Sequence, residues 1–101
     1  MSGQVGSRAD GSPEPDFKRQ VELAFDNLKA VLAAADCTFE DIVDVTTFHT
    51  DPGQHLDTIM AVRAQAFAEP PHPNWTAIGV TWLAGFDFEI KVIARVPERQ
   101  A

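Results

Sequence analysis

The sequence has few basic residues, a single cysteine and no long apolar run, and each of these shortages argues against a class of protein. Only 8 of the 101 residues are Lys or Arg, against 15 Asp or Glu, which gives a net charge of −7. Nucleic acids and anionic membranes select basic surfaces, so neither is an expected partner. Cys37 has no second cysteine with which to form a disulfide, which fits a reducing compartment.

No segment is apolar for long enough to cross a bilayer, and residues 1–4 lack the basic and apolar residues that open a signal peptide. We therefore expect a soluble, cytoplasmic protein. The chain has no internal repeat and no linker long enough to separate domains, so residues 1–101 are expected to form one domain. The core of a chain this short is modest, and oligomerisation would help to stabilise it.

The clearest pattern lies in residues 86–96, where apolar and polar side chains alternate. This alternation predicts a strand that is buried on one face. Residues 73–82 form another extended, largely apolar run, and the short break between the two runs contains Gly85. A hairpin is the arrangement that such a break favours. The mostly polar face of the last strand carries Glu89, the carboxylate that we select as the candidate for chemistry.

Two helices are expected before these strands. Apolar residues recur every three or four positions over residues 17–35, after Asp16, whose carboxylate can cap the first helical turn. A second helix is expected from about residue 54 to residue 68. Residues 42–50 are rich in β-branched side chains and predict a strand between the helices, and residues 4–5 can form a short one. This order predicts an α+β fold with two helices on one face of a mixed sheet.

The predicted sheet has one face that the helices leave uncovered. If both helices cover the apolar side of residues 86–96, the opposite face combines charges, Thr residues and large apolar side chains. Such a face is more apolar than contact with solvent requires. A partner subunit packed against it is the simplest explanation.

Segments along almost the whole chain resemble the reactive-intermediate deaminase family, the Rid or YjgF-like proteins. The matching segments are residues 2–4, 28–32, 41–48 and 89–94. The resemblance implies a chorismate-mutase-like α+β domain that assembles as a homotrimer, with a site in each cleft between subunits. It also implies that the chain begins at the family's second strand, so that the family's first strand is missing.

The best-known activity of that family is the hydrolysis of enamines and imines to a keto acid and ammonia, without a metal or organic cofactor. Water must add to the imine carbon, so a carboxylate that positions or deprotonates the water is the useful side chain. Glu89 falls at the family's position for this group. The resemblance therefore implies a small-molecule metabolite as the substrate and Glu89 as the catalytic residue.

The resemblance also identifies candidate substrate-binding residues, namely Trp75, Arg63, Ser2 and Gly3. Trp75 stands where the family has an arginine that holds the substrate's carboxylate, and an indole with one N–H and no charge cannot replace that group. Arg63, on the second helix, is a candidate to supply the positive charge instead. Ser2 and Gly3 match a segment whose backbone lines the cleft.

These candidates also have plain structural interpretations. Glu89 can be a solvated strand residue paired with Lys91 on the same face. Trp75 can be an aromatic residue packed at a subunit boundary, or a wall on which a flat or cationic ligand stacks. Arg63 can be a side chain that reaches solvent with its stem on the apolar stripe of the helix.

The remaining reactive residue types carry no recognisable motif. His49, His55 and His72 lack the spacing of metal ligands, so no metal site is expected. Cys37 has no base beside it in the sequence, which makes it a poor candidate nucleophile. Two alternatives to an enzyme stay open: a non-catalytic protein that binds a metabolite against Trp75, and a chaperone-like or regulatory scaffold of the same fold.

Overall fold

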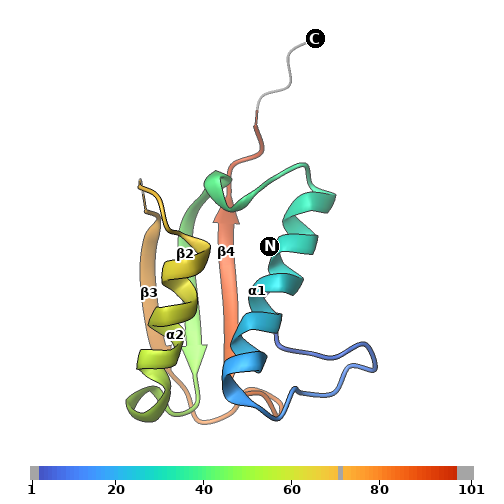
Figure 1. The fold of residues 1–101 in the computed structure, drawn as a ribbon, viewed down its shortest axis with the longest axis vertical. Helices are drawn as coiled ribbons and strands as arrows, with labels where there is room; N and C mark the ends of the chain where they lie inside the picture. The colour runs from blue at the N-terminus through green and yellow to red at the C-terminus, as the bar shows by residue number, and fades with distance from the viewer. Residues whose placement is uncertain (1–2, 71, 98–101) are drawn as a thin grey trace.

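The computed structural model describes residues 3–70 and 72–97, which form a four-stranded mixed sheet with two helices on one face (Figure 1). This arrangement confirms the predicted α+β class. One turn of 3-10 helix, η1 (Phe39–Asp41), precedes the second strand. The strands are β1 (Gln4–Val5), β2 (Ile42–His49), β3 (Asn74–Gly79) and β4 (Phe88–Ala94), and the helices are α1 (Phe17–Ala34) and α2 (Pro52–Ala66).

The sheet has the strand order β1-β4-β2-β3. β4 is antiparallel to both β1 and β2, whereas β3 is parallel to β2 on the other edge of that strand. β2, α2 and β3 therefore form a strand–helix–strand crossover, the usual way to connect two parallel strands. The predicted hairpin between residues 73–82 and 86–96 is wrong, because β2 lies between β3 and β4.

The break that suggested the hairpin is nevertheless a tight turn. Ala84 and Gly85 have φ values of 55° and 95°, and the Phe86 N–H donates to the Leu83 carbonyl oxygen at 3.0 Å. Two positive φ values and this hydrogen bond are typical of a type I′ turn, which commonly closes hairpins. Here the turn lies within the connection that leads from β3, on one side of β2, to β4 on the other.

Local capping sets where both helices begin. The Asp16 carboxylate accepts a hydrogen bond from the backbone N–H of Arg19, as expected for an N-cap. The Asp51 carboxylate accepts from the N–H of Gln54, and Pro52 occupies the first helical position, where its missing N–H costs nothing. α2 thus begins two residues before the predicted start. Neither helix of the described ranges is long and apolar enough to span a membrane.

The helices cover one face of the sheet, with α1 over β1 and β4 and α2 in front of β2 and β3 (Figure 1). The side chains on this face are at most 1% exposed at the centre of β4 and β2, which confirms the predicted core face of β4. They are Phe88, Ile90 and Val92 of β4 with Val45, Thr47 and His49 of β2. α1 packs its buried stripe against them, including Val21, Ala24, Phe25, Leu28 and Leu32.

No described helix covers the other face of the sheet, which we call the open face. Ile93 of β4 and Ile78 of β3 lie on it with 55% and 39% of their surface exposed. The strand register places polar and apolar side chains side by side across this face. They are Glu89 and Lys91 of β4, Phe48, Thr46 and Asp44 of β2, and Thr76 and Asn74 of β3.

Candidate functional site

Glu89 projects from β4 onto the open face and is half-buried there. Its neighbours across the sheet are Val5 of β1 on one side and Phe48 of β2 on the other. Glu89 does not form an ion pair with Lys91. The ion pair found within residues 3–70 and 72–97 joins Arg19 and Glu22. The Glu89 carboxylate also accepts no hydrogen bond from another described residue. It is therefore a carboxylate between apolar neighbours, with its oxygens available to a ligand or water.

Gly3 lies directly against this carboxylate. A Cβ atom on residue 3 would lie 2.6 Å from Cδ and 2.7 Å from Oε2 of Glu89, which is closer than carbon and oxygen atoms approach without a bond. The absence of a side chain at residue 3 lets the Glu89 carboxylate pack against the backbone just before β1. Gly3 and Glu89, two of the predicted site residues, are thus brought together. Ser2, a third, lies outside the described residues.

Trp75 and Arg63 form a second cluster on the helix-covered side. The Arg63 guanidinium carbon lies 4.4 Å from the centroid of the Trp75 ring, a cation–π contact between α2 and β3. Phe67, at the end of α2, meets the indole edge-on with ring centroids 5.8 Å apart. The side chain of Arg63 itself therefore occupies the cation position over the tryptophan that the sequence left open to a ligand.

A buried pair of polar residues holds Trp75 in place. The Trp75 Nε1–H donates to Thr47 Oγ1 at 3.1 Å, and Thr47 Oγ1 lies 2.6 Å from His49 Nε2. Burial lowers the pKa of His49, and the nearby His55 lowers it further, so the imidazole is neutral at pH 7. Sequence reasoning missed Thr47 and His49 as supports of the site. The alternation of β2, which places residues 45, 47 and 49 on one face, is the signal that could have found them.

The Glu89 and Trp75 clusters lie on opposite faces of the same sheet. Residues 75 and 77 of β3 pair with Val45 and Thr47 on the helix-covered face, whereas Glu89 pairs with Phe48 on the open face. One copy of the chain therefore does not bring Glu89 and Trp75 into a shared cleft. A cleft that contains both side chains requires two copies.

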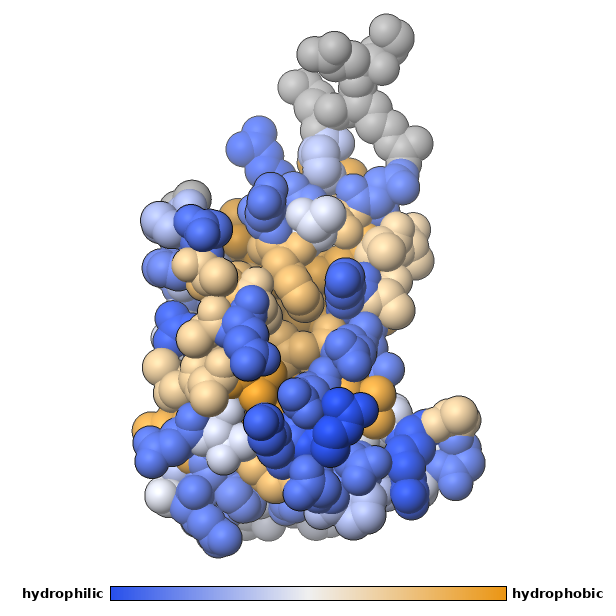
Figure 2. Space-filling model, viewed as in Figure 1, coloured by the Kyte–Doolittle hydropathy of each residue, from blue (hydrophilic) through white to orange (hydrophobic). Residues whose placement is uncertain are grey.

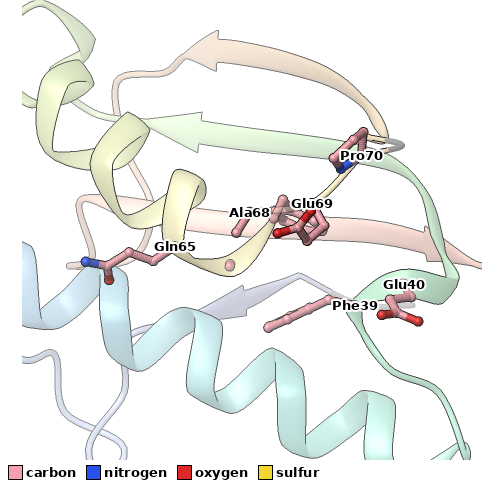
Figure 3. Close-up of a pocket in the computed structure, with 8 residues that line it drawn as sticks. Phe39, Glu40, Gln65, Ala68, Glu69 and Pro70 are labelled. Atoms are coloured by element: carbon pink, nitrogen blue, oxygen red, sulfur yellow. The ribbon is translucent and has the colours of Figure 1, made fainter.

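Two cavities lie along α2. One of about 300 Å³ is lined by Met60, Arg63, Ala64, Phe67, Ala68 and His72. Another of about 540 Å³ lies where the end of α2 faces η1, and Figure 3 shows Gln65, Ala68 and Glu69 on one side of it and Phe39 and Glu40 on the other. Its described lining residues include the carboxylates of Glu40 and Glu69 and no cationic group, so it does not suit an anionic ligand.

Apolar side chains also gather between α1 and α2 on the helix-covered side of the molecule (Figure 2). Phe39 and Ala66 line both the 540 Å³ cavity and an adjacent one that extends toward α1. None of the predicted site residues lines these two cavities. We therefore centre the candidate site on the Glu89 and Trp75 clusters instead.

The three histidines lie in different surroundings, although His55 is near enough to His49 to lower its pKa. His49 is buried in the sheet, His55 stacks on Phe17 with ring centroids 3.6 Å apart, and His72 is exposed. Among the described residues, no three His, Cys, Asp or Glu side chains lie close enough together to hold a metal ion. Cys37 is buried after the end of α1, with its Sγ 3.5 Å from the Ala35 carbonyl oxygen.

Comparison with known proteins shows extensive similarity. The profile of a family described as Endoribonuclease L-PSP matches residues 1–96. The RutC family protein YjgH of Escherichia coli (strain K12) is 71% identical over 99 residues, which cover 98% of this chain and 76% of that protein.

Solved structures extend this similarity to the fold. A structure of protein YjgH matches with a TM-score of 0.95 at 71% identity, over 98% of this chain and 76% of the other. The structure of RidA from an Antarctic Psychrobacter species matches with a TM-score of 0.86 at 29% identity, over 93% and 76% of the two chains.

Proposed function

This chain belongs to the YjgF-like, or Rid, family, and we propose that it hydrolyses small reactive imines and enamines to a keto acid and ammonia. The observation that carries this function is the Glu89 carboxylate. It is half-buried between Val5 and Phe48, packs against Gly3 and makes no hydrogen bond to a described residue. A carboxylate with free oxygens beside apolar walls is suited to general acid–base work on a small neutral molecule.

In the first step, water attacks the imine carbon while Glu89 accepts one of its protons. The imine nitrogen gains a proton from solvent, and a carbinolamine results. In the second step, Glu89 returns its proton to the nitrogen, and the C–N bond breaks with its electron pair leaving on ammonia. The hydroxyl group gives up its proton to solvent and becomes the keto oxygen. An enamine enters the same sequence after protonation at carbon gives the imine.

We propose further that copies of the chain assemble as a homotrimer, with the open face of one copy against the α2 and β3 side of the next. The mixture of Phe48, Ile78 and Ile93 with polar groups on the open face supports such an interface. Leu56 and Met60, each more than 40% exposed on α2, supply apolar surface on the other side. This arrangement brings Glu89 of one copy toward Trp75 of another.

The test is incubation with imino acids that an amino-acid oxidase generates in the same vessel, while ammonia and keto acid are followed. We expect keto acid to appear faster than in a control that contains the oxidase alone. A rate no higher than this background across imines of different side chain would contradict the function. Single-stranded RNA is tested in parallel, because the family description names an endoribonuclease; cleavage of RNA without imine hydrolysis would also contradict it.

Replacing Gly3 with alanine is expected to remove activity without unfolding the protein. The new methyl group would overlap the far end of the Glu89 side chain, which can swing away, rather than rigid backbone. The free energy of unfolding should change by no more than about 0.5 kcal/mol. Turnover should fall about tenfold or more, because a catalytic group displaced by even 1 Å loses much of its effect. Urea unfolding and keto acid release measure the two quantities.

The matched control is Gly53→Ala, in the first turn of α2, where the nearest atom to a new Cβ lies 4.0 Å away. It should change neither turnover nor stability to a comparable extent. Full activity in the Gly3→Ala variant would mean that the contact between residue 3 and the carboxylate has no role in the reaction.

A further inference from the structure

His49 is a buried histidine whose hydrogen bonds are only half satisfied. Its side chain is 1% exposed, and its Nε2 lies 2.6 Å from Thr47 Oγ1. Its Nδ1 is also buried but has no hydrogen-bond partner among the described residues. The ring meets Phe88 edge-on, with centroids 5.7 Å apart. Buried polar atoms are nearly always paired, so this exception calls for an explanation.

The hydrogen-bond geometry indicates where the protons of this site lie. Thr47 Oγ1 accepts from the Trp75 N–H at 3.1 Å and has a single hydrogen to donate. If the neutral imidazole carries its proton on Nδ1, the Thr47 hydrogen goes to His49 Nε2, and one N–H of this described trio is left unpaired. The opposite tautomer leaves two groups of the trio unpaired, namely Nδ1 and the hydroxyl hydrogen. We therefore assign the imidazole proton to Nδ1.

Protonation of His49 is incompatible with this arrangement. An imidazolium donates from both nitrogens, so Nε2 can no longer accept the Thr47 hydrogen. Thr47 Oγ1 must then accept from both His49 and Trp75, while its own hydrogen loses its acceptor. The new charge is also buried beside the Phe88 ring, where an unpaired charge is costly. The arrangement relaxes when His49 leaves Thr47, and the support of Trp75 is then weakened.

His55 is the titratable neighbour that the helices contribute. It lies in the first turn of α2 and stacks on Phe17 of α1 with ring centroids 3.6 Å apart. Its Nδ1 is likewise buried, with no partner in the described part of the chain. Burial lowers the pKa of His49 most, and His55 lowers it further because like charges repel. A proton on His55 therefore makes a proton on His49 less favourable.

The described strands contribute no compensating charge. Gly79 of β3 and Phe88 of β4 pair with His49 in the sheet. The carboxylate of Asp87, which precedes Phe88, accepts a hydrogen bond from Thr50 Oγ1 at 2.8 Å and is not among the groups that shift the pKa of His49. Within residues 3–70 and 72–97, no anion is therefore in place to stabilise the imidazolium.

We propose that His49 is a pH-sensitive latch on Trp75: the neutral imidazole holds the indole through Thr47, and protonation of the imidazole releases it. The latch adds pH control to one cluster of the candidate site and does not depend on the imine hydrolysis proposed above. Folding lowers the pKa of His49 below its usual value of 6.5. Neutral His49 therefore contributes stability that is fully present above pH 6.5 and is lost as the pH falls through the lower pKa of the folded state.

NMR of Trp75 tests the latch directly. Trp82 is 75% exposed, and a Trp82→Phe background leaves one indole signal. The indole N–H resonance of Trp75 and the ring resonances of His49 are followed from pH 8 to pH 5. We expect both to move with the same midpoint, below pH 6.5. A Trp75 resonance that stays in place down to pH 5 would overturn the latch.

Three histidine variants identify the group that titrates. His49→Gln keeps a hydrogen-bonding group near Nε2 but gains no proton in this range, so the Trp75 resonance should stay constant. His72→Gln, the same substitution at an exposed histidine, should behave as the parent. His55→Gln removes the like charge and should move the midpoint to higher pH. A transition that persists in His49→Gln, or one that disappears in His55→Gln, would mean that another group is the sensor.

Thr47 variants test whether the signal passes through the hydroxyl group. In Thr47→Val, His49 should still titrate while the Trp75 resonance no longer follows it, and Thr47→Ser should restore the coupling. A general loosening of the core in acid would instead move the Trp75 resonance in the Thr47→Val variant as well, which would contradict the latch. Urea unfolding at pH 7.5 verifies that each variant is folded.

The pH dependence of stability gives an independent measurement. Between pH 7.5 and pH 5.5 the urea midpoint of the parent should fall further than that of His49→Gln, because only the parent loses the contribution of neutral His49. Equal falls would contradict the unfavourable protonation on which the latch depends. None of these measurements involves imine turnover, so a failure of the latch is distinguished from a failure of the hydrolytic function.

Discussion

Replacing Glu89 with glutamine is expected to lower kcat for imine hydrolysis by about 10²- to 10⁴-fold, the usual contribution of a general acid–base group. Glutamine preserves the shape of the side chain but accepts no proton at neutral pH, so water at the imine carbon is no longer activated. The affinity for pyruvate, a keto acid product of the proposed reaction, should stay within about twofold of the parent, because the proposed role of Glu89 is to act on the water rather than on the ligand's carboxylate. Steady-state rates and a titration of the protein with pyruvate measure the two effects.

The same chemical change at an exposed glutamate is the control. Glu69→Gln, after the end of α2, makes the identical substitution on another surface and should leave kcat unchanged. Substantial activity in the Glu89→Gln variant would show that another group activates the water. A loss of pyruvate affinity equal to the loss of kcat would instead favour a binding protein over an enzyme.

Replacing Phe88 with alanine should have the largest effect on stability, about 3–5 kcal/mol of the free energy of unfolding. Phe88 is 0% exposed and lies at the centre of the core. Its ring stacks on Phe25 of α1 with centroids 6.2 Å apart and meets His49 of β2 edge-on at 5.7 Å. The truncation leaves a cavity between α1 and the sheet that neither strand can close.

Urea unfolding measures the loss as a shift of the midpoint. An unchanged slope of the transition verifies that the variant and the parent expose a similar amount of surface on unfolding. Phe88→Leu keeps most of the volume and should cost less than about 1.5 kcal/mol. A cost below 1 kcal/mol for the alanine variant would mean that α1 does not depend on this contact. Because Glu89 follows Phe88 on the same strand, the alanine variant should also lose activity at temperatures below its unfolding transition.

The helices and strands could be predicted because each carries a local period. The apolar stripe of α1 repeats every three to four residues, and β4 alternates between Phe88, Glu89 and Ile90. The alternation of β4 was also enough to place Glu89 on the face that the helices leave open. Burial of one side of an element imposes these periods, so the sequence retains them.

The pairing of the strands could not be predicted in the same way. A type I′ turn at Ala84 and Gly85 is compatible with a hairpin, but the turn specifies only the path of a few residues. β2 has two edges, and the parallel crossover through α2 gives one of them to β3 and leaves the other to β4. That choice depends on how the helices cover the sheet, which is a property of the whole chain.

The cluster of Trp75 and Arg63 also could not be predicted from local sequence patterns. The contact between Arg63 and Trp75 joins a helix to an edge strand, and no period in either segment predicts it. Trp75 lies in a strand whose residues alternate only weakly between polar and apolar, so its orientation toward Thr47 was not evident. Such contacts appear only once β3 is known to lie beside β2.

Glu89 and Arg63 lie on opposite sides of one sheet, which has a consequence for mixtures of impaired chains. In a cleft between copies, Glu89→Gln chains contribute an intact arginine and Arg63→Met chains an intact glutamate. Unfolding the two variants together and refolding them as hybrids should place both intact groups in about a quarter of the clefts, and so restore about a quarter of the parent rate. Separately refolded samples that are then combined should stay impaired if subunits do not exchange.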